Sequence, residues 1–167
     1  MRRILISLPG IALSGLFLTG PLAARADTPV KSEKVPAEVK RAIDQKYAGA
    51  KQKGWETESE NGKTVYEVKL VRGKEHLEVS VTPEGKIASE ETEVAVATVP
   101  EPVKAALHAS AYGKWKVRKA ERILEGGDAD KVSYELAIER TSAKGRERAE
   151  VVFDPAGKMI KEERPAH

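Results

Sequence analysis

Short segments of the chain alternate hydrophobic with polar residues, and this period of two predicts β-strands. Tyr66, Val68 and Leu70, for example, are separated by polar residues. Turn sequences such as Asn61-Gly62 lie between some of these segments, because both residues accept a positive φ. The expected strands, which include some weaker and more charged segments, cover residues 51–59, 64–71, 76–81, 86–94, 133–139 and 149–153.

Two further segments carry hydrophobic residues at helical spacing, and each follows a Val-Pro pair. Pro36 and Pro100 suit the first turn of a helix, because the N–H that proline lacks has no intrahelical partner there. We expect each helix to cover the apolar face of the strands that follow it, with Tyr66 and Tyr134 buried beneath and Glu67 in water. The two apolar stripes are Val39, Ala42, Ile43 and Tyr47, then Val103, Ala106, Leu107 and Ala111.

These elements occur twice in the same order. Residues 35–40 return as 99–104 at an offset of 64 residues, and 66–68 return as 134–136 at an offset of 68. The sequence therefore predicts an α+β fold of two tandem repeats, each with one helix packed on a four-stranded antiparallel meander. The expected boundaries are a flexible lead-in at 27–34, repeat one at 35–98, repeat two at 99–163 and a tail at 164–167.

Residues 1–26 have the features of a secretory signal peptide. Arg2 and Arg3 precede an uncharged, largely apolar stretch, and Ala24-Arg25-Ala26 places small residues for cleavage before Asp27. The apolar stretch is too short for a spanning helix, so we expect no stable membrane insertion after cleavage. The chain has no Cys, and its stability in an oxidising compartment must come from burial alone. We expect a periplasmic protein, with an extracellular location as the alternative.

The net charge argues against a nucleic-acid partner. The whole chain has 29 Lys and Arg against 26 Asp and Glu, which gives a formal net charge of +3. Three of the arginines lie in residues 1–26, so the mature chain is neutral. A phosphate-binding surface needs clustered, uncompensated basic residues, and the sequence contains no such block.

The sequence predicts no enzyme, no cofactor and no metal site. The three histidines are His76, His108 and His167, and none is placed beside a plausible nucleophile. His76 and Glu78 share one face of an expected strand, but a zinc site needs at least a third protein ligand. Residues 128–139 begin like a calcium loop but lack the required glycine and oxygen ligand at the centre.

The order of motifs resembles the PepSY-like family, and more narrowly its β-lactamase-inhibitor-like branch, in two tandem copies. The resemblance rests on a Val-Pro pair before a short helix, a Tyr-Glu-Val strand, and a Pro-x-Gly-Lys turn before a Glu-rich strand. It covers residues 35–94 and 99–163. The resemblance implies small exported domains without catalytic residues, with roles in protein binding and in the inhibition of secreted enzymes.

We therefore expect a protein-binding module whose partner is another periplasmic or envelope protein or peptide. Trp55 and Trp115 are candidate aromatic anchors, and packing in the core is the alternative for both. Lys69, His76 and Arg148 are candidate contacts on the sheet faces that the helices leave open. The alternative function is a small-molecule or metal-responsive sensor or carrier, which would need a ligand cavity or a clustered site.

Overall fold

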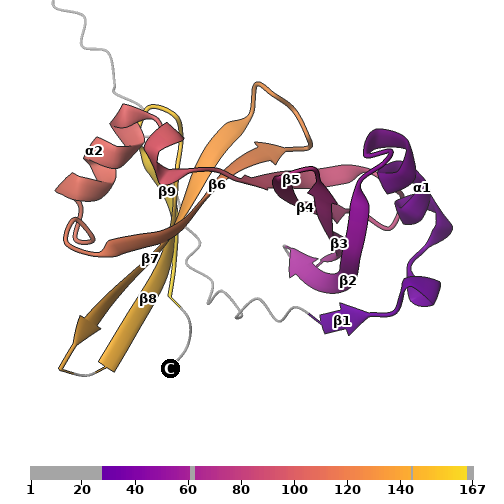
Figure 1. Ribbon diagram of the computed structural model, residues 1–167, viewed down its shortest axis with the longest axis horizontal. Helices are drawn as coiled ribbons and strands as arrows, with labels where there is room; N and C mark the ends of the chain where they lie inside the picture. Colours follow the sequence, from indigo (N-terminus) through magenta and orange to yellow (C-terminus); the bar gives the residue numbers. More distant parts are fainter. Residues whose placement is uncertain (1–27, 61–62, 144, 165–167) are drawn as a thin grey trace, which may run out of the picture.

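In the computed structural model, residues 28–60, 63–143 and 145–164 are described, and they form one antiparallel sheet of nine strands with two α-helices (Figure 1). The order of the strands in the sheet follows their order in the chain. The strands are β1 Thr28–Val30, β2 Lys51–Glu60, β3 Lys63–Arg72, β4 Glu75–Val81, β5 Ile87–Glu93, β6 Lys116–Glu125, β7 Val132–Ser142, β8 Gly145–Phe153 and β9 Met159–Glu163. The helices are α1 Ala37–Lys46 and α2 Glu101–Ala109, each preceded by a short 3-10 turn.

The predicted α+β class with two repeats is confirmed, but the strands of both repeats belong to one sheet of nine, not to two sheets of four. The repeats join where β5 pairs with β6, with Glu93 opposite Glu121. In the same way, β1 pairs with β2, with Val30 opposite Trp55. Each pairing has a 3-10 turn and an α-helix inserted between its two strands. The unit that recurs is therefore strand, helix, strand.

The segment 27–34, for which the sequence predicts a flexible lead-in, contains β1 and the 3-10 turn Ser32–Lys34. This is the counterpart in repeat one of the end of β5 and the 3-10 turn Val96–Thr98. At the other end of the chain, Arg164 of the predicted tail donates hydrogen bonds to the Tyr112 hydroxyl. Residues 165–167, like the leader 1–26 and its cleavage site, lie outside the described residues.

Both helices pack on the same face of the sheet, at opposite ends of the molecule (Figure 1). Each covers one buried hydrophobic cluster, as the apolar stripes predict. The cluster beneath α1 contains Val35, Val39, Ile43, Tyr47, Trp55, Val68, Leu70, Leu77, Val79 and Val81. The cluster beneath α2 contains Val99, Val103, Leu107, Tyr112, Ala120, Leu136, Ile138, Ala149, Val151 and Phe153.

A turn glycine holds each helix start close to the sheet. Gly85 and Gly157 both have a positive φ, in the equivalent turns before β5 and β9. A Cβ at Gly85 would lie 2.9 Å from the Glu38 carbonyl oxygen of α1, and one at Gly157 would lie 2.5 Å from the Pro102 carbonyl oxygen of α2. Only glycine fits both the backbone conformation and the contact.

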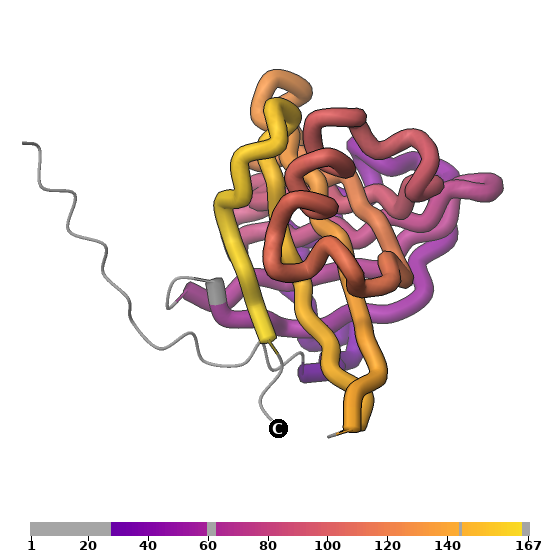
Figure 2. Tube along the Cα trace, turned by 90° about the vertical axis from the view of Figure 1, so that its left-hand side faces the viewer, coloured from indigo at the N-terminus to yellow at the C-terminus, as the bar shows by residue number. Residues whose placement is uncertain are grey.

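The sheet twists strongly between the repeats. Figure 2 shows the strands of repeat two in front, running across those of repeat one behind. Such twist follows from the right-handed twist of each strand, accumulated over many strands. The face opposite the helices, called the open face from here on, runs continuously across the β5–β6 pairing because directly opposed residues share a face.

The structure corrects one expectation about burial. Tyr66 and Tyr134 are partly buried and pack against their two clusters. Glu67, expected in water, is only 6% exposed. It belongs to a second set of buried residues, which lies on the open face. The set comprises Glu58, Val65, Glu67, Ser80, Ser89, Glu121, Ile123, Ser133 and Val152.

Candidate functional site

A groove of about 210 Å³ lies on the open face where the two repeats meet, and we call it the junction groove. Repeat one contributes residues of β2, β3, β4 and β5, and repeat two contributes residues of β6. Because β5 and β6 are adjacent only through the pairing between repeats, neither repeat can form this groove alone. Its polar lining residues are Lys53, Lys69, His76, Glu78, Glu93, Lys119 and Glu121.

Both central lysines of the groove pair with glutamates. Lys69 Nζ lies 3.1 Å from Glu56 Oε2 on β2. Lys119 Nζ lies 2.7 Å from Glu121 Oε1 on its own strand and 3.7 Å from Glu78 Oε1 on β4. The second of these contacts crosses β5 and links repeat two to repeat one. The ammonium groups of Lys69 and Lys119 are therefore both paired with carboxylates.

The pKa values of three groups in the groove are shifted by burial and by neighbouring charges. Burial, reinforced by the charges of Glu78 and Glu93, raises the pKa of Glu121 despite its contact with Lys119. Burial alone would lower the pKa of Lys119, but its hydrogen bond to Glu121 and the nearby carboxylates outweigh that effect, and its pKa is raised. The pKa of Lys69 is raised by the same balance of causes. The carboxylates around both lysines thus stabilise the charged form of each ammonium group.

Glutamates outnumber basic residues on the open face. Among the described side chains of β2–β7, strand register places ten glutamates on this face with five lysines and His76. The bulge residues Lys53 and Arg118 also reach it, Lys53 at the junction groove and Arg118 at Glu139. The glutamates are Glu56, Glu58, Glu67, Glu78, Glu91, Glu93, Glu121, Glu125, Glu135 and Glu139.

The structure brings two of the predicted contact residues together and separates the third. Lys69 and His76 both line the junction groove. Arg148 lies on the open face of β8, two strands beyond β6, where its Nε is 3.9 Å from Glu139 Oε2. It therefore lies outside the groove.

The two tryptophans do not lie on the open face. Trp55 is 5% exposed beneath α1, where its Nε1 donates to Gln52 Oε1 at 3.2 Å. Of the two roles considered for Trp55, core packing is therefore the one that the structure supports. Trp115 is half-buried against the cluster beneath α2, edge-on to Tyr112, with the Arg140 guanidinium 4.8 Å from its ring centroid.

Sequence reasoning missed Glu93, Lys119 and Glu121 as parts of this site. Their proximity depends on the register between β5 and β6, and α2 separates these strands in the chain. One signal was present: Glu56 and Glu121 follow equivalent core positions, Trp55 and Ala120, in the two repeats.

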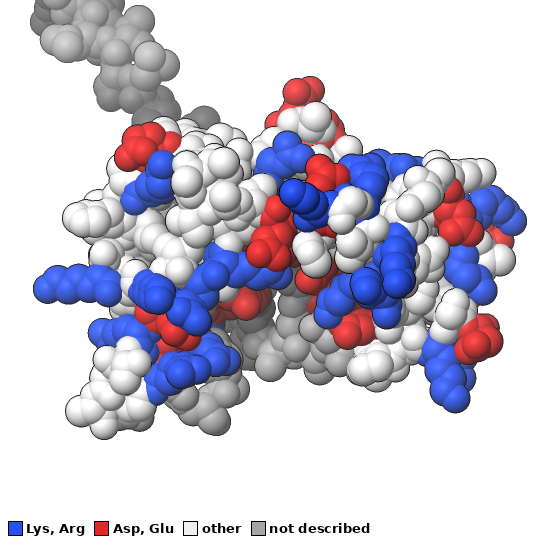
Figure 3. All heavy atoms as spheres, in the orientation of Figure 1, with Lys and Arg blue, Asp and Glu red and all other residues white. Residues whose placement is uncertain are grey.

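No group of three or more His, Asp or Glu side chains is placed to hold a metal ion within the part of the chain that the structure describes. Glu78, the partner considered for His76, instead contacts Lys119. On the side of the molecule seen in Figure 3, acidic and basic side chains alternate and do not separate into large patches. This mixture is unlike the basic stripe of a nucleic-acid-binding surface.

Comparison with known protein families identifies the fold unit. The model of the family described as "Putative beta-lactamase-inhibitor-like, PepSY-like" matches the chain twice, at residues 24–89 and 86–161. The chain belongs to the PepSY-like family. The two matches correspond to the two repeats, and the junction groove lies between two PepSY-like copies. A search of curated proteins finds no match.

Solved structures share the arrangement of both PepSY-like copies. One described as "putative periplasmic proteins" from Bacteroides eggerthii DSM 20697 is 18% identical, with a TM-score of 0.64 over 78% of this chain and 88% of that one. A DUF2874 family protein from Bacteroides uniformis ATCC 8492 is 21% identical, with a TM-score of 0.60 over 77% and 88%. A BLIP-like protein from Bacteroides fragilis NCTC 9343 is 18% identical, with a TM-score of 0.57 over 77% and 86%. At these identities the likeness establishes the fold.

Neither described helix has the length and apolar character needed to cross a membrane, as judged over the residues that the structure places.

Proposed function

We propose that this PepSY-like protein is an exported, non-enzymatic binding module that engages another envelope protein through the junction groove. The observation that carries the proposal is the acid-rich open face, formed jointly by the two repeats and left uncovered by either helix. Inhibition of a secreted enzyme, or assistance to one, is the role that the family description supports.

The charges of the groove favour a partner that presents Lys or Arg side chains. Solvated ion pairs contribute only about 0–1 kcal/mol each, and the Lys69 side chain is 44% exposed beside Glu56, so a basic side chain of a partner can replace Lys69 there at little cost. The surrounding glutamates would also steer such a partner during encounter, an effect that weakens as salt is added. His76 and Glu93 are exposed at the groove and would meet the partner directly.

An exported location is supported by the leader-like composition of residues 1–26. The Bacteroides eggerthii neighbour is itself described as periplasmic. The intact mass of the protein recovered from a periplasmic fraction tests this part of the proposal. We expect cleavage before Asp27, and a retained leader would contradict it.

The binding role is tested with a matched pair of charge reversals. The partner is captured on tagged mature protein from periplasmic extract, identified and produced, and its affinity is measured by titration calorimetry. We expect Glu93→Lys, in the groove, to weaken binding about tenfold or more at low salt. Glu33→Lys makes the same charge change at an exposed site before α1, and it should leave the affinity within about twofold.

Equal effects of Glu93→Lys and Glu33→Lys would show that net charge, and not the groove, controls binding. A partner whose affinity does not change in either variant would remove the groove from the account. A small-molecule carrier is the second candidate function, and one specific observation, a hollow beneath α2, favours it.

A further inference from the structure

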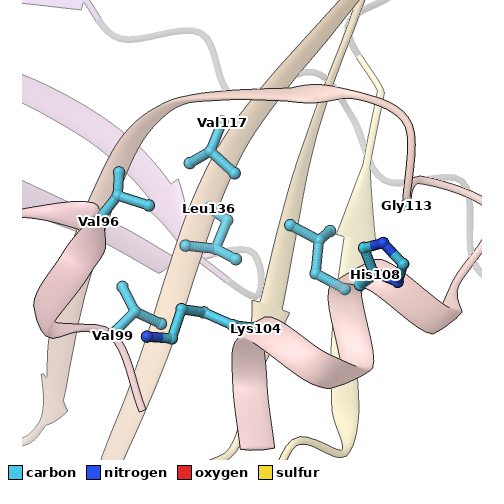
Figure 4. A pocket seen from close by; sticks show the side chains of 8 residues that line it. Val96, Val99, Lys104, His108, Gly113, Val117 and Leu136 are labelled. Atoms are coloured by element: carbon cyan, nitrogen blue, oxygen red, sulfur yellow. The ribbon is translucent and has the colours of Figure 1, made fainter. Parts of the chain in front are cut away.

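An apolar hollow of about 190 Å³ lies between α2, the 3-10 turn before it and the start of β6 (Figure 4). Val99, Leu107 and Leu136 form its floor, and each is less than a tenth exposed. In Figure 4, Val117 borders it from β6, Val96 from the 3-10 turn, and Lys104 and His108 from the helix. None of its eight lining residues is acidic.

Comparison of the two repeats shows why this space is present beneath α2. Trp55 lies opposite Val68 in repeat one, and Ala120 lies opposite Leu136 in repeat two. Both positions follow a one-residue bulge in their strand. Trp55 and Ala120 are therefore equivalent positions, and repeat two has a methyl group where repeat one has an indole.

The indole of repeat one packs among the residues that correspond to the walls of the hollow. Val35, Ile43 and Val68 form one buried cluster with Trp55. By repeat offset and strand register, these three correspond to Val99, Leu107 and Leu136, the floor of the hollow. The hollow beneath α2 therefore lies among the counterparts of residues that form the cluster with Trp55 beneath α1.

The direction of the indole supports the same correspondence. Trp55 Nε1 reaches back across the bulge to Gln52 Oε1 at 3.2 Å. The register places Val117 at the position equivalent to Gln52, and Val117 lines the hollow. Repeat two therefore has neither the ring nor its polar partner, and the floor of the hollow is apolar.

The rim of the hollow supplies positive charge. Lys104 Nζ pairs with Glu101 Oε2 at 3.0 Å, but the glutamate side chain is 81% exposed. Such a solvated pair is weak, so a ligand carboxylate can compete for the ammonium group. His108 is exposed on the next turn of α2, and its imidazole is a second polar group at the rim, beside the Lys104 ammonium group.

We infer that this hollow binds a small amphipathic carboxylate, with its apolar tail against Leu107, Val117 and Leu136 and its carboxylate at Lys104. Engineered apolar cavities of about 150 Å³ stay dry and accept a molecule the size of benzene. A tail of roughly five to seven carbons therefore matches the space. This ligand class is independent of the proposed protein partner, because the hollow and the junction groove lie on opposite faces of the sheet.

The test titrates hexanoate, with 1-hexanol as the neutral comparator, into mature protein and follows backbone amide shifts by NMR. We expect saturable shifts centred on α2 and Val117 for both ligands, with hexanoate binding more tightly. Lys104→Met should weaken hexanoate at least about fivefold and leave hexanol unchanged. Lys40→Met, the matched change on α1, should alter neither affinity.

Filling the space tests the origin of the hollow. Ala120→Trp combined with Val117→Gln rebuilds the side-chain pair of repeat one, and hexanoate binding should fall at least about tenfold. Unchanged binding in a folded double variant would overturn the inference, and so would shifts that map elsewhere or no saturable binding in the wild type. If the double variant fails to fold, the contrast between Lys104→Met and Lys40→Met decides the question, and equal effects of the two would overturn it.

Discussion

Replacing Trp55 with alanine tests the packing beneath α1 and, with it, the comparison between the repeats. The side chain is 5% exposed and packs in a cluster with α1 and strands β2–β4. Truncation of a buried Trp or Phe to Ala costs about 3–5 kcal/mol through lost burial and the cavity left behind. Trp55→Ala also leaves Gln52 without its indole partner. We therefore expect a loss in the upper half of that range.

The loss is measured by urea unfolding of mature protein, monitored by far-ultraviolet circular dichroism. A chain of this size has a total stability of about 5–15 kcal/mol, so the variant loses a large fraction of it. Its thermal midpoint should fall by about 10 °C or more, since each kcal/mol shifts Tm by roughly 2–4 °C at this length.

Trp115→Ala is the control, because it removes the same side chain from a half-buried site. It gives up the edge-on contact with Tyr112 and the guanidinium of Arg140, and such contacts contribute about 0.5–1.5 kcal/mol each. We expect a cost of about 1–2 kcal/mol. If Trp55→Ala costs no more than Trp115→Ala, the indole is not a core residue, and the explanation of the hollow by Ala120 fails with it.

Three further predictions concern stability, each measured by urea unfolding. Burial raises the pKa of Glu121, so the stability linked to its neutral form is present below the ordinary glutamate pKa and is lost as pH rises through the folded-state value. The stability of Glu121→Gln relative to the wild type should therefore rise between pH 3 and pH 7, and a fall over that range would contradict this sign. Tyr47→Phe removes a 2.5 Å hydrogen bond to Glu90 Oε2 and should cost about 1.5 kcal/mol, whereas no loss would mean that water replaces the bond. Gly157→Ala should cost more than about 2 kcal/mol, because its Cβ would meet the Pro102 carbonyl oxygen. Gly73 also has a positive φ but has open space around its Cβ position, so Gly73→Ala should cost only about 1 kcal/mol. Equal costs would show that the turn at Gly157 shifts to accommodate the methyl group.

The sequence could predict the elements because their periodicities reflect burial directly. The apolar stripes of both helices and the alternation at Val68 and Leu136 lie where the two clusters form. Alternation assigns each strand residue to one of two faces of the sheet, however, and does not show how far the side chains on each face are buried. Glu67 was assigned correctly to the face opposite Val68, yet it is buried there among its neighbours on the open face. The side-chain period alone therefore could not show that both faces hold buried residues.

The site was harder to predict because it depends on pairing between distant strands. Lys69 and His76 are near neighbours in one hairpin, so local alternation was enough to group them. Glu93 and Lys119 come together only through the β5–β6 register, which a helix of nine residues interrupts in the chain. The strand β1 was missed for a related reason: three residues, one of them proline, give too short a pattern to recognise.

Site-specific photocrosslinking tests the central claim, that the open face at the junction is the surface that binds a partner. A benzoylphenylalanine is placed at His76, exposed in the junction groove, and in a parallel variant at Ala105, exposed on α2. Both mature proteins are irradiated in periplasmic extract, and the adducts are identified by mass spectrometry. The account predicts one envelope protein crosslinked from His76, reduced by the added Glu93→Lys change, and no such adduct from Ala105. The same protein crosslinked from Ala105 but not from His76 would contradict it.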